Sequence, residues 1–216
     1  MKNIFNLLVL SIIGALMSCG GGGSSSASAP AAPALTAEPI DFAKAIVTDY
    51  STDGLKHVKN VDPNGGFVTS EGPIYNDMKE GTWIVYYTGR DTNKIKKLTN
   101  YHQDQISGLS LEFSNSGTIT KRIDYDKGQI HGVYAEYKYN RAQKYIEYTH
   151  GVMNGAYNTY YSTGKKQQET TYTNGKKNGK SVFYNEEEQI IMEFEYKNGE
   201  KISGGNVTPT SPSDVK

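Results

Sequence analysis

The sequence predicts an all-β protein, an elongated antiparallel meander of repeated β-hairpins that is largely a single layer. The main observation is one frame that recurs along the chain: a tyrosine, glycines three and seven residues later, and an aromatic residue twelve residues later. The tyrosines that begin the copies, called the anchor tyrosines, are Tyr75, Tyr101, Tyr125, Tyr148, Tyr172 and Tyr196. They recur every 23 to 26 residues, and self-similarity at such a period indicates a repeat architecture.

Each copy of the frame has the pattern of a hairpin. Residues 119–125 and 133–137 alternate with the period of two that strands require. Asn174-Gly175 and Asn198-Gly199 supply the positive φ angles that tight turns need. Up to three glycines in every copy, each costing about 1 kcal/mol inside a helix, exclude a helical repeat. Strands joined by turns without a crossover must pair antiparallel.

The repeated pattern resembles the bacterial variant of the MORN repeat, found in YwqK-like proteins. The segment Gly81-Thr82-Trp83-Ile84-Val85-Tyr86-Tyr87 has the Gly-x-Trp-x-x-Tyr-Tyr form typical of that family. The resemblance covers about residues 67–204, and in other copies Ser110, Tyr134, Tyr157 and Ser181 replace the tryptophan. It implies a hairpin array and, because YwqK-like proteins are often labelled antitoxins, an alternative function as an immunity-like protein that binds a toxin.

Residues 1–18 are predicted to be a lipoprotein signal peptide. A basic start is followed by an apolar run from Ile4 to Met17, which has the size of a signal-peptide core and is short for a membrane span. Leu16-Met17-Ser18-Cys19 resembles a bacterial lipobox, which implies that Cys19 carries the lipid; the alternative is an ordinary secretory signal. Gly20 after the cysteine favours the outer membrane. We therefore expect an exported protein anchored in the cell envelope.

The remaining domain boundaries follow from composition. Residues 19–39 are rich in glycine, serine, alanine and proline and are predicted to be a flexible tether. Residues 40–74 carry a degenerate pattern, interpreted as cap strands at 43–50, 55–61 and 67–75, with a short helix at 41–47 as the alternative. The repeats then occupy 75–204, and residues 205–216 are predicted to be a disordered tail.

Charge and residue types exclude several functions. The chain has 23 basic and 23 acidic residues, so no basic excess attracts nucleic acid. Cys19 is the only cysteine, which removes thiol chemistry once it is lipidated. The four histidines form no column in the repeat and are interpreted as scattered surface residues, and no phosphate loop is present. We expect no cofactor and no metal.

No enzymatic activity is expected. Glu112 and Glu136 occupy equivalent positions in neighbouring copies and are interpreted as solvated strand residues. A glycosidase needs two carboxyl groups at a fixed separation in a cleft. A cell-envelope hydrolase that uses these glutamates is the competing, less favoured function.

Exposed aromatic side chains are the remaining functional signal. Trp83, Tyr134 and Tyr157 share one column of the repeat and are predicted to be the binding face, opposite Tyr137 and Tyr160. The anchor tyrosines are expected on the other face. The alternative is that these rings stack on one another and hold a sheet that lacks a second layer. The predicted function is a lipid-anchored module that binds or scaffolds an envelope protein or glycan.

Overall fold

The computed structural model describes residues 35–209. The predicted signal peptide, the lipid attachment at Cys19 and most of the tether lie outside the described residues, as does most of the predicted tail. Within residues 35–209, no helix has the length and apolar character that crossing a membrane requires.

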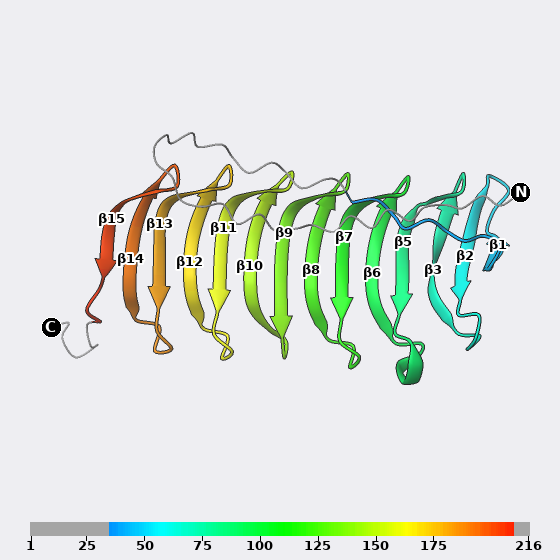
Figure 1. Cartoon of the computed structure of the whole chain (residues 1–216), viewed down its shortest axis with the longest axis horizontal. Coiled ribbons are helices and arrows are strands. Elements are labelled where there is room, and N and C mark those ends of the chain that lie inside the picture. The colour runs from blue at the N-terminus through cyan, green and yellow to red at the C-terminus, as the bar shows by residue number, and fades with distance from the viewer. Residues whose placement is uncertain (1–34, 210–216) are drawn as a thin grey trace, which may run out of the picture.

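All fifteen strands of the described chain belong to one open antiparallel sheet (Figure 1). They are β1 (Ala45–Asp49), β2 (Leu55–Val61), β3 (Val68–Tyr75), β4 (Met78–Lys79), β5 (Gly81–Tyr86), β6 (Ile95–His102), β7 (Gln105–Phe113), β8 (Ile119–Asp126), β9 (Gln129–Lys138), β10 (Arg141–Thr149), β11 (Val152–Tyr160), β12 (Lys166–Thr173), β13 (Lys176–Tyr184), β14 (Ile190–Lys197) and β15 (Glu200–Asn206). Each strand pairs with its neighbours in the chain, except that the two-residue β4 pairs only with β3. The prediction of a single-layer meander of hairpins is confirmed.

The region before the repeats also forms strands. A turn over residues 42–44 leads into β1, so the helix considered for residues 41–47 is not formed. β1, β2 and β3 follow the three predicted cap strands closely, and the only helical turn in the described chain is a 3₁₀ turn at Gly89–Asp91.

The tight turns have the two positive φ angles of type I′ hairpins. Asn174 and Gly175 have φ of 49° and 76°, and the same signs occur at Lys127 and Gly128 with 46° and 78°. Type I′ turns match the right-handed twist of paired strands and require φ above zero at both central residues. The glycine three residues after Tyr125, Tyr148, Tyr172 and Tyr196 thus occupies the second of these positions, and Asp104 occupies it after Tyr101.

Several of the tight turns are also hydrogen-bonded to the preceding hairpin. The amide of Gly151 donates to the carbonyl oxygen of Ile130 at 2.7 Å, and that of Gly175 donates to Met153 at 2.8 Å. Gly128 and Gly199 make the equivalent bonds one repeat earlier and one repeat later. A line of hydrogen bonds therefore joins the turns along one edge of the array and holds the repeats in register.

Replacing Lys127 with asparagine is expected to stabilise the protein. Lys127 has φ of +46°, and the left-handed conformation costs most residues roughly 1–2 kcal/mol but costs asparagine less. We expect Lys127→Asn to raise the free energy of unfolding by about 0.5–1 kcal/mol, measured by urea denaturation. The reverse change, Asn174→Lys, is the control and should destabilise by a similar amount. Equal midpoints for both variants and wild type would contradict this role of the turn.

The register assigns the side chains to two faces. Trp83 pairs with Thr99 and Tyr134 with Ile123 and Ile146, so these side chains share what we call the tryptophan face. The row that crosses this face consists of Trp83, Thr99, Ser110, Ile123, Tyr134, Ile146, Tyr157, Thr170, Ser181 and Phe194. The opposite side, which we call the arginine face, carries Leu111, Arg122 and Ala135 in register.

The anchor tyrosines from Tyr101 to Tyr196 lie on the tryptophan face, so the expectation that they occupy the other face was wrong for these five. Tyr75 follows Ile74, which packs against Trp83, and therefore lies on the arginine face. The rings of Tyr134 and Tyr148 are 6.4 Å apart, and those of Tyr157 and Tyr172 are 5.8 Å apart. The reason is the hairpin register: Tyr125 pairs with Ile130, and Tyr134 lies four positions after Ile130, an even number that returns the chain to the same face.

An irregularity at the second glycine of the frame is stabilised by the residue before the anchor tyrosine. The Asp124 carboxylate accepts a hydrogen bond from the Val133 amide at 3.2 Å. One repeat later, Glu147 accepts from the Ala156 amide at 2.9 Å. These side chains replace ladder bonds that the bulged backbone cannot make.

Candidate binding surfaces

Trp83 is buried, so the exposure expected for it is not observed. Its side chain is 2% exposed and packs with Val58 and Ile74. Its indole Nε1 donates a hydrogen bond to the Pro73 carbonyl oxygen at 2.8 Å. Trp83 is therefore part of the core at the N-terminal end of the array.

The cover over Trp83 comes partly from the chain that precedes β1. Ile40 and Ala45 pack against the cluster of Trp83, Val58 and Ile74. Upstream, the amide of Ala37 donates to the Asp104 carbonyl oxygen at 2.7 Å. Figure 1 shows this segment crossing the strands near the side of the tight turns.

Lys79 is a buried cation beside the tryptophan. It is 8% exposed, and its ammonium group lies 4.6 Å from the centre of the Trp83 ring and 5.3 Å from that of Tyr101. The ammonium also donates to the Glu38 carbonyl oxygen at 3.0 Å. Burial lowers the pKa of Lys79, partly offset by Asp104 and Glu38. The two rings and the carbonyl replace the water that the cation loses.

Tyr134 and Tyr157, the other residues of the predicted binding column, are half-buried. Each packs against an anchor tyrosine, and the Tyr134 hydroxyl donates to Glu136. Burial and that hydrogen bond raise the pKa of Tyr134, which keeps the hydroxyl a neutral donor. The ring stacking considered as an alternative is therefore observed, whereas a binding role for Trp83, Tyr134 and Tyr157 stays a prediction.

Hydroxyl pairs occupy the same row where rings are missing. Thr99 and Ser110 are buried with their oxygens 3.2 Å apart, and Thr170 and Ser181 are buried with theirs 2.7 Å apart. Each hydroxyl has a partner on the neighbouring strand, so these polar groups do not lack hydrogen bonds. This part of the row therefore offers no free polar group to a ligand.

The two glutamates of the competing hydrolase are paired with lysines. Glu112 lies 3.6 Å from the Lys121 ammonium, and Glu136 lies 4.0 Å from that of Lys144. These side chains alternate in charge along the tryptophan face because the register places Glu112, Lys121, Glu136 and Lys144 opposite one another in succession. The arrangement matches the interpretation as strand residues, while the absence of catalysis stays a prediction.

Two of the histidines that the sequence analysis interpreted as scattered are in contact in the structure. The rings of His131 and His150 are 4.5 Å apart, and His150 Nε2 lies 3.7 Å from Asp126. The repeat frame contained the information that predicts this contact. The residue before the second glycine accepts a hydrogen bond from an amide of the next tight turn: His131 accepts from the His150 amide at 3.3 Å, and Asn154 accepts from the Asn174 amide at 3.2 Å. In residues 35–209, no three His, Cys, Asp or Glu side chains are arranged to hold a metal ion.

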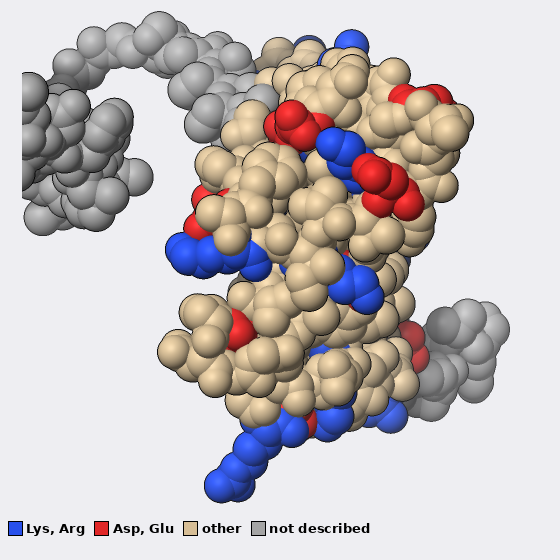
Figure 2. Space-filling view, turned by 90° about the vertical axis from the view of Figure 1, so that its right-hand side faces the viewer, with Lys and Arg blue, Asp and Glu red and all other residues tan. Residues whose placement is uncertain are grey.

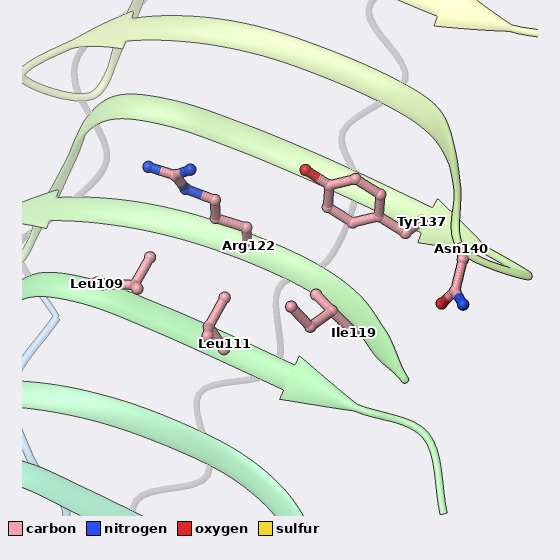
Figure 3. Close-up of a pocket in the computed structure, with 6 residues that line it drawn as sticks. All are labelled: Leu109, Leu111, Ile119, Arg122, Tyr137 and Asn140. Atoms are coloured by element: carbon pink, nitrogen blue, oxygen red, sulfur yellow. The ribbon is translucent and has the colours of Figure 1, made fainter. Parts of the chain in front are cut away.

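A pocket of about 440 Å³ lies on the arginine face (Figure 3). It is lined by Leu109, Leu111, Ile119, Arg122, Tyr137 and Asn140. These residues come from β7, β8, β9 and the turn after β9. Leu109 and Ile119 remain 37% and 40% exposed. The pocket is thus a mainly apolar hollow with polar groups at its margin.

Arg122 does not make the pocket an anion site. Its Nε and Nη2 donate to the two carboxylate oxygens of Asp124 at 3.2 and 3.1 Å. Asp124 raises the pKa of Arg122 and neutralises its charge locally. An uncharged apolar group is therefore the best match to the hollow. Sequence reasoning missed the pocket, although the period of two in Leu109 and Leu111 already placed both on the face opposite Ser110.

The fold and these surfaces define a repeat-built, single-layer β-sheet protein with side chains available on both faces. No family model matches the chain, and no curated protein matches it in sequence. The resemblance to the MORN-variant repeat therefore stays a prediction.

Proposed function

We propose that the chain is a lipid-anchored protein of the bacterial cell envelope whose hairpin array binds or scaffolds a partner. The single observation that best supports the proposal is the pocket on the arginine face. Its exposed leucine and isoleucine side chains beside Tyr137 resemble the apolar centre of a protein interface more than a polar glycan site. We therefore favour a protein partner over a glycan.

The expected result is loss of partner capture when the pocket becomes polar. The double variant Leu109→Ser/Ile119→Ser should retrieve about tenfold less partner from solubilised envelope than wild type, because two apolar anchors are removed. Both side chains are exposed by more than a third, so the fold should be retained. Capture is measured with the full chain as bait, followed by quantitative mass spectrometry.

The matched control is Val85→Ser. Val85 is 36% exposed. It pairs with Lys97, which pairs with Glu112 on the tryptophan face, so Val85 lies on that face as well. Tyr157→Ala tests the column predicted from the sequence in the same experiment. Equal capture by wild type and the pocket variant rejects the pocket, and loss only with Tyr157→Ala moves the site to the tryptophan face.

Two further arms test the anchor and the alternative ligand. Cys19→Ala should move the protein from the membrane fraction to the soluble fraction if the cysteine carries lipid. Capture by purified cell-wall glycan in place of envelope protein would favour the glycan. A captured toxin that acts at the envelope would favour the immunity-like alternative.

A further inference from the structure

Both ends of the sheet are open edges. In the described chain β1 pairs only with β2, and β15 pairs only with β14. Ile46 on β1 is 56% exposed and Ile202 on β15 is 59% exposed. An unpaired strand presents free N–H and C=O groups that another strand can bind. Figure 2, seen from the β1 end, shows a few acidic and basic side chains among many uncharged ones.

We propose that copies of this chain associate head to tail, with β15 of one copy pairing with β1 of the next. The sheet has 15 strands, and without β4 the continuous path has fourteen, all antiparallel to their neighbours. An even number makes β1 and β15 run in opposite directions. A second copy, displaced along the array without being turned round, therefore presents its β1 antiparallel to β15.

The register at this junction follows from the rows of the tryptophan face. At one end, Val47 pairs with Val58 and Asp49 pairs with Lys56. At the other end, Gly204 pairs with Phe194. Continuing the row of Phe194 across the junction places Gly204 opposite Val47 of the next copy.

The second row, that of the anchor tyrosines, places a charge pair at the junction. Lys201 pairs with Tyr196 at the end of this row, and Asp49 is the corresponding residue at the other end of the sheet. Gly204 can lie opposite Val47 while Lys201 lies opposite Asp49 if β15 bulges by one residue, because three positions separate Lys201 from Gly204 and two separate Val47 from Asp49. β15 already has this one-residue bulge against β14, at Glu195 and Tyr196.

Opposite charges at this position favour one register. Lys201 opposite Asp49 forms an ion pair. A second β1 edge offers no such partner, because Asp49 is the only charged residue of β1. The alternation of charges along the face, as in Glu112 and Lys121, would then continue across the junction. The resulting contact joins different surfaces and does not close on itself, so it generates an open row of copies.

Cysteine cross-linking tests the register directly. In the full chain with Cys19→Ser, Asp49→Cys and Lys201→Cys are made as separate variants and mixed in detergent under mild oxidation. Opposed residues on antiparallel strands have Cα atoms about 4.5–5.5 Å apart, within the range of a disulfide. We expect a mixed dimer, identified by mass spectrometry. Replacing Lys201→Cys with Lys180→Cys, on the arginine face, should give none.

Charge exchange provides a second measurement that does not depend on disulfide formation. Asp49→Lys alone and Lys201→Asp alone should each raise the dissociation constant roughly tenfold, measured by sedimentation velocity, because like charges then face one another. The double exchange should restore it. A monomer at every concentration, or cross-links chiefly between two Asp49→Cys chains, would overturn the proposal. Circular dichroism shows that each variant is folded before the comparison.

Discussion

Trp83→Ala is expected to cost about 3–5 kcal/mol of folding free energy, the range for removing a buried aromatic side chain. The indole is 2% exposed and fills the space between Val58 and Ile74. Its loss leaves a cavity and also removes the ring face beneath the Lys79 ammonium, 4.6 Å away. Urea denaturation followed by circular dichroism measures the change, since the variant lacks the only tryptophan of the chain.

Two controls separate burial from ring chemistry. Trp83→Phe keeps an aromatic ring and should lose clearly less stability than Trp83→Ala. Tyr139→Ala removes a ring that is 83% exposed and should change the free energy of unfolding by at most about 0.5 kcal/mol. If Trp83→Ala unfolds at the wild-type urea concentration, the indole is not a core residue and the predicted exposed position regains support.

The repeat made the fold predictable because every copy carries the same information. Alternating residues identified the strands, and pairs such as Asn174-Gly175 identified the tight turns that connect them. Even the degenerate region from β1 to β3 was recognised, since its turn residues follow the same chemistry. A meander needs only local pairing, so no long-range contact had to be guessed.

The assignment of the anchor tyrosines to the opposite face failed because the hairpin register is a three-dimensional property. Tyr134 and Tyr148 lie on the same face of the sheet. This outcome depends on how many residues separate the paired positions of each hairpin, including the residues of the bulge near Gly132. A single residue of difference would reverse the outcome. The period of the frame alone does not contain that count.

The candidate sites were harder to predict for a related reason. Trp83 is covered partly by Ile40, which lies in a segment with no repeat pattern and is placed by contacts between distant residues. The pocket beside Arg122 needs Leu109 from β7 and Tyr137 from β9 together. Sequence reasoning treated each repeat as equivalent, whereas both features depend on residues that differ between repeats.

Gly72→Ala is expected to destabilise the protein by about 1–3 kcal/mol, the range for forcing extra atoms into a packed core. A methyl group at this position would lie 2.5 Å from the Trp83 ring, well inside contact distance. Gly72 pairs with Val58 on β2, and both Val58 and Trp83 are buried. The ring therefore has to move for the alanine to fit.

A double-mutant cycle shows whether the indole is the cause. In a Trp83→Leu background the smaller side chain leaves room, so adding Gly72→Ala should cost at least about 1 kcal/mol less than it does in wild type. Gly205→Ala is the matched control, because a methyl group there meets no atom within 4 Å. If Gly72→Ala costs the same in both backgrounds, the penalty comes from the backbone of β3 and not from a side chain packed over it. Tryptophan fluorescence of Gly72→Ala gives an independent measurement, since an indole displaced toward solvent emits at longer wavelength than a buried one.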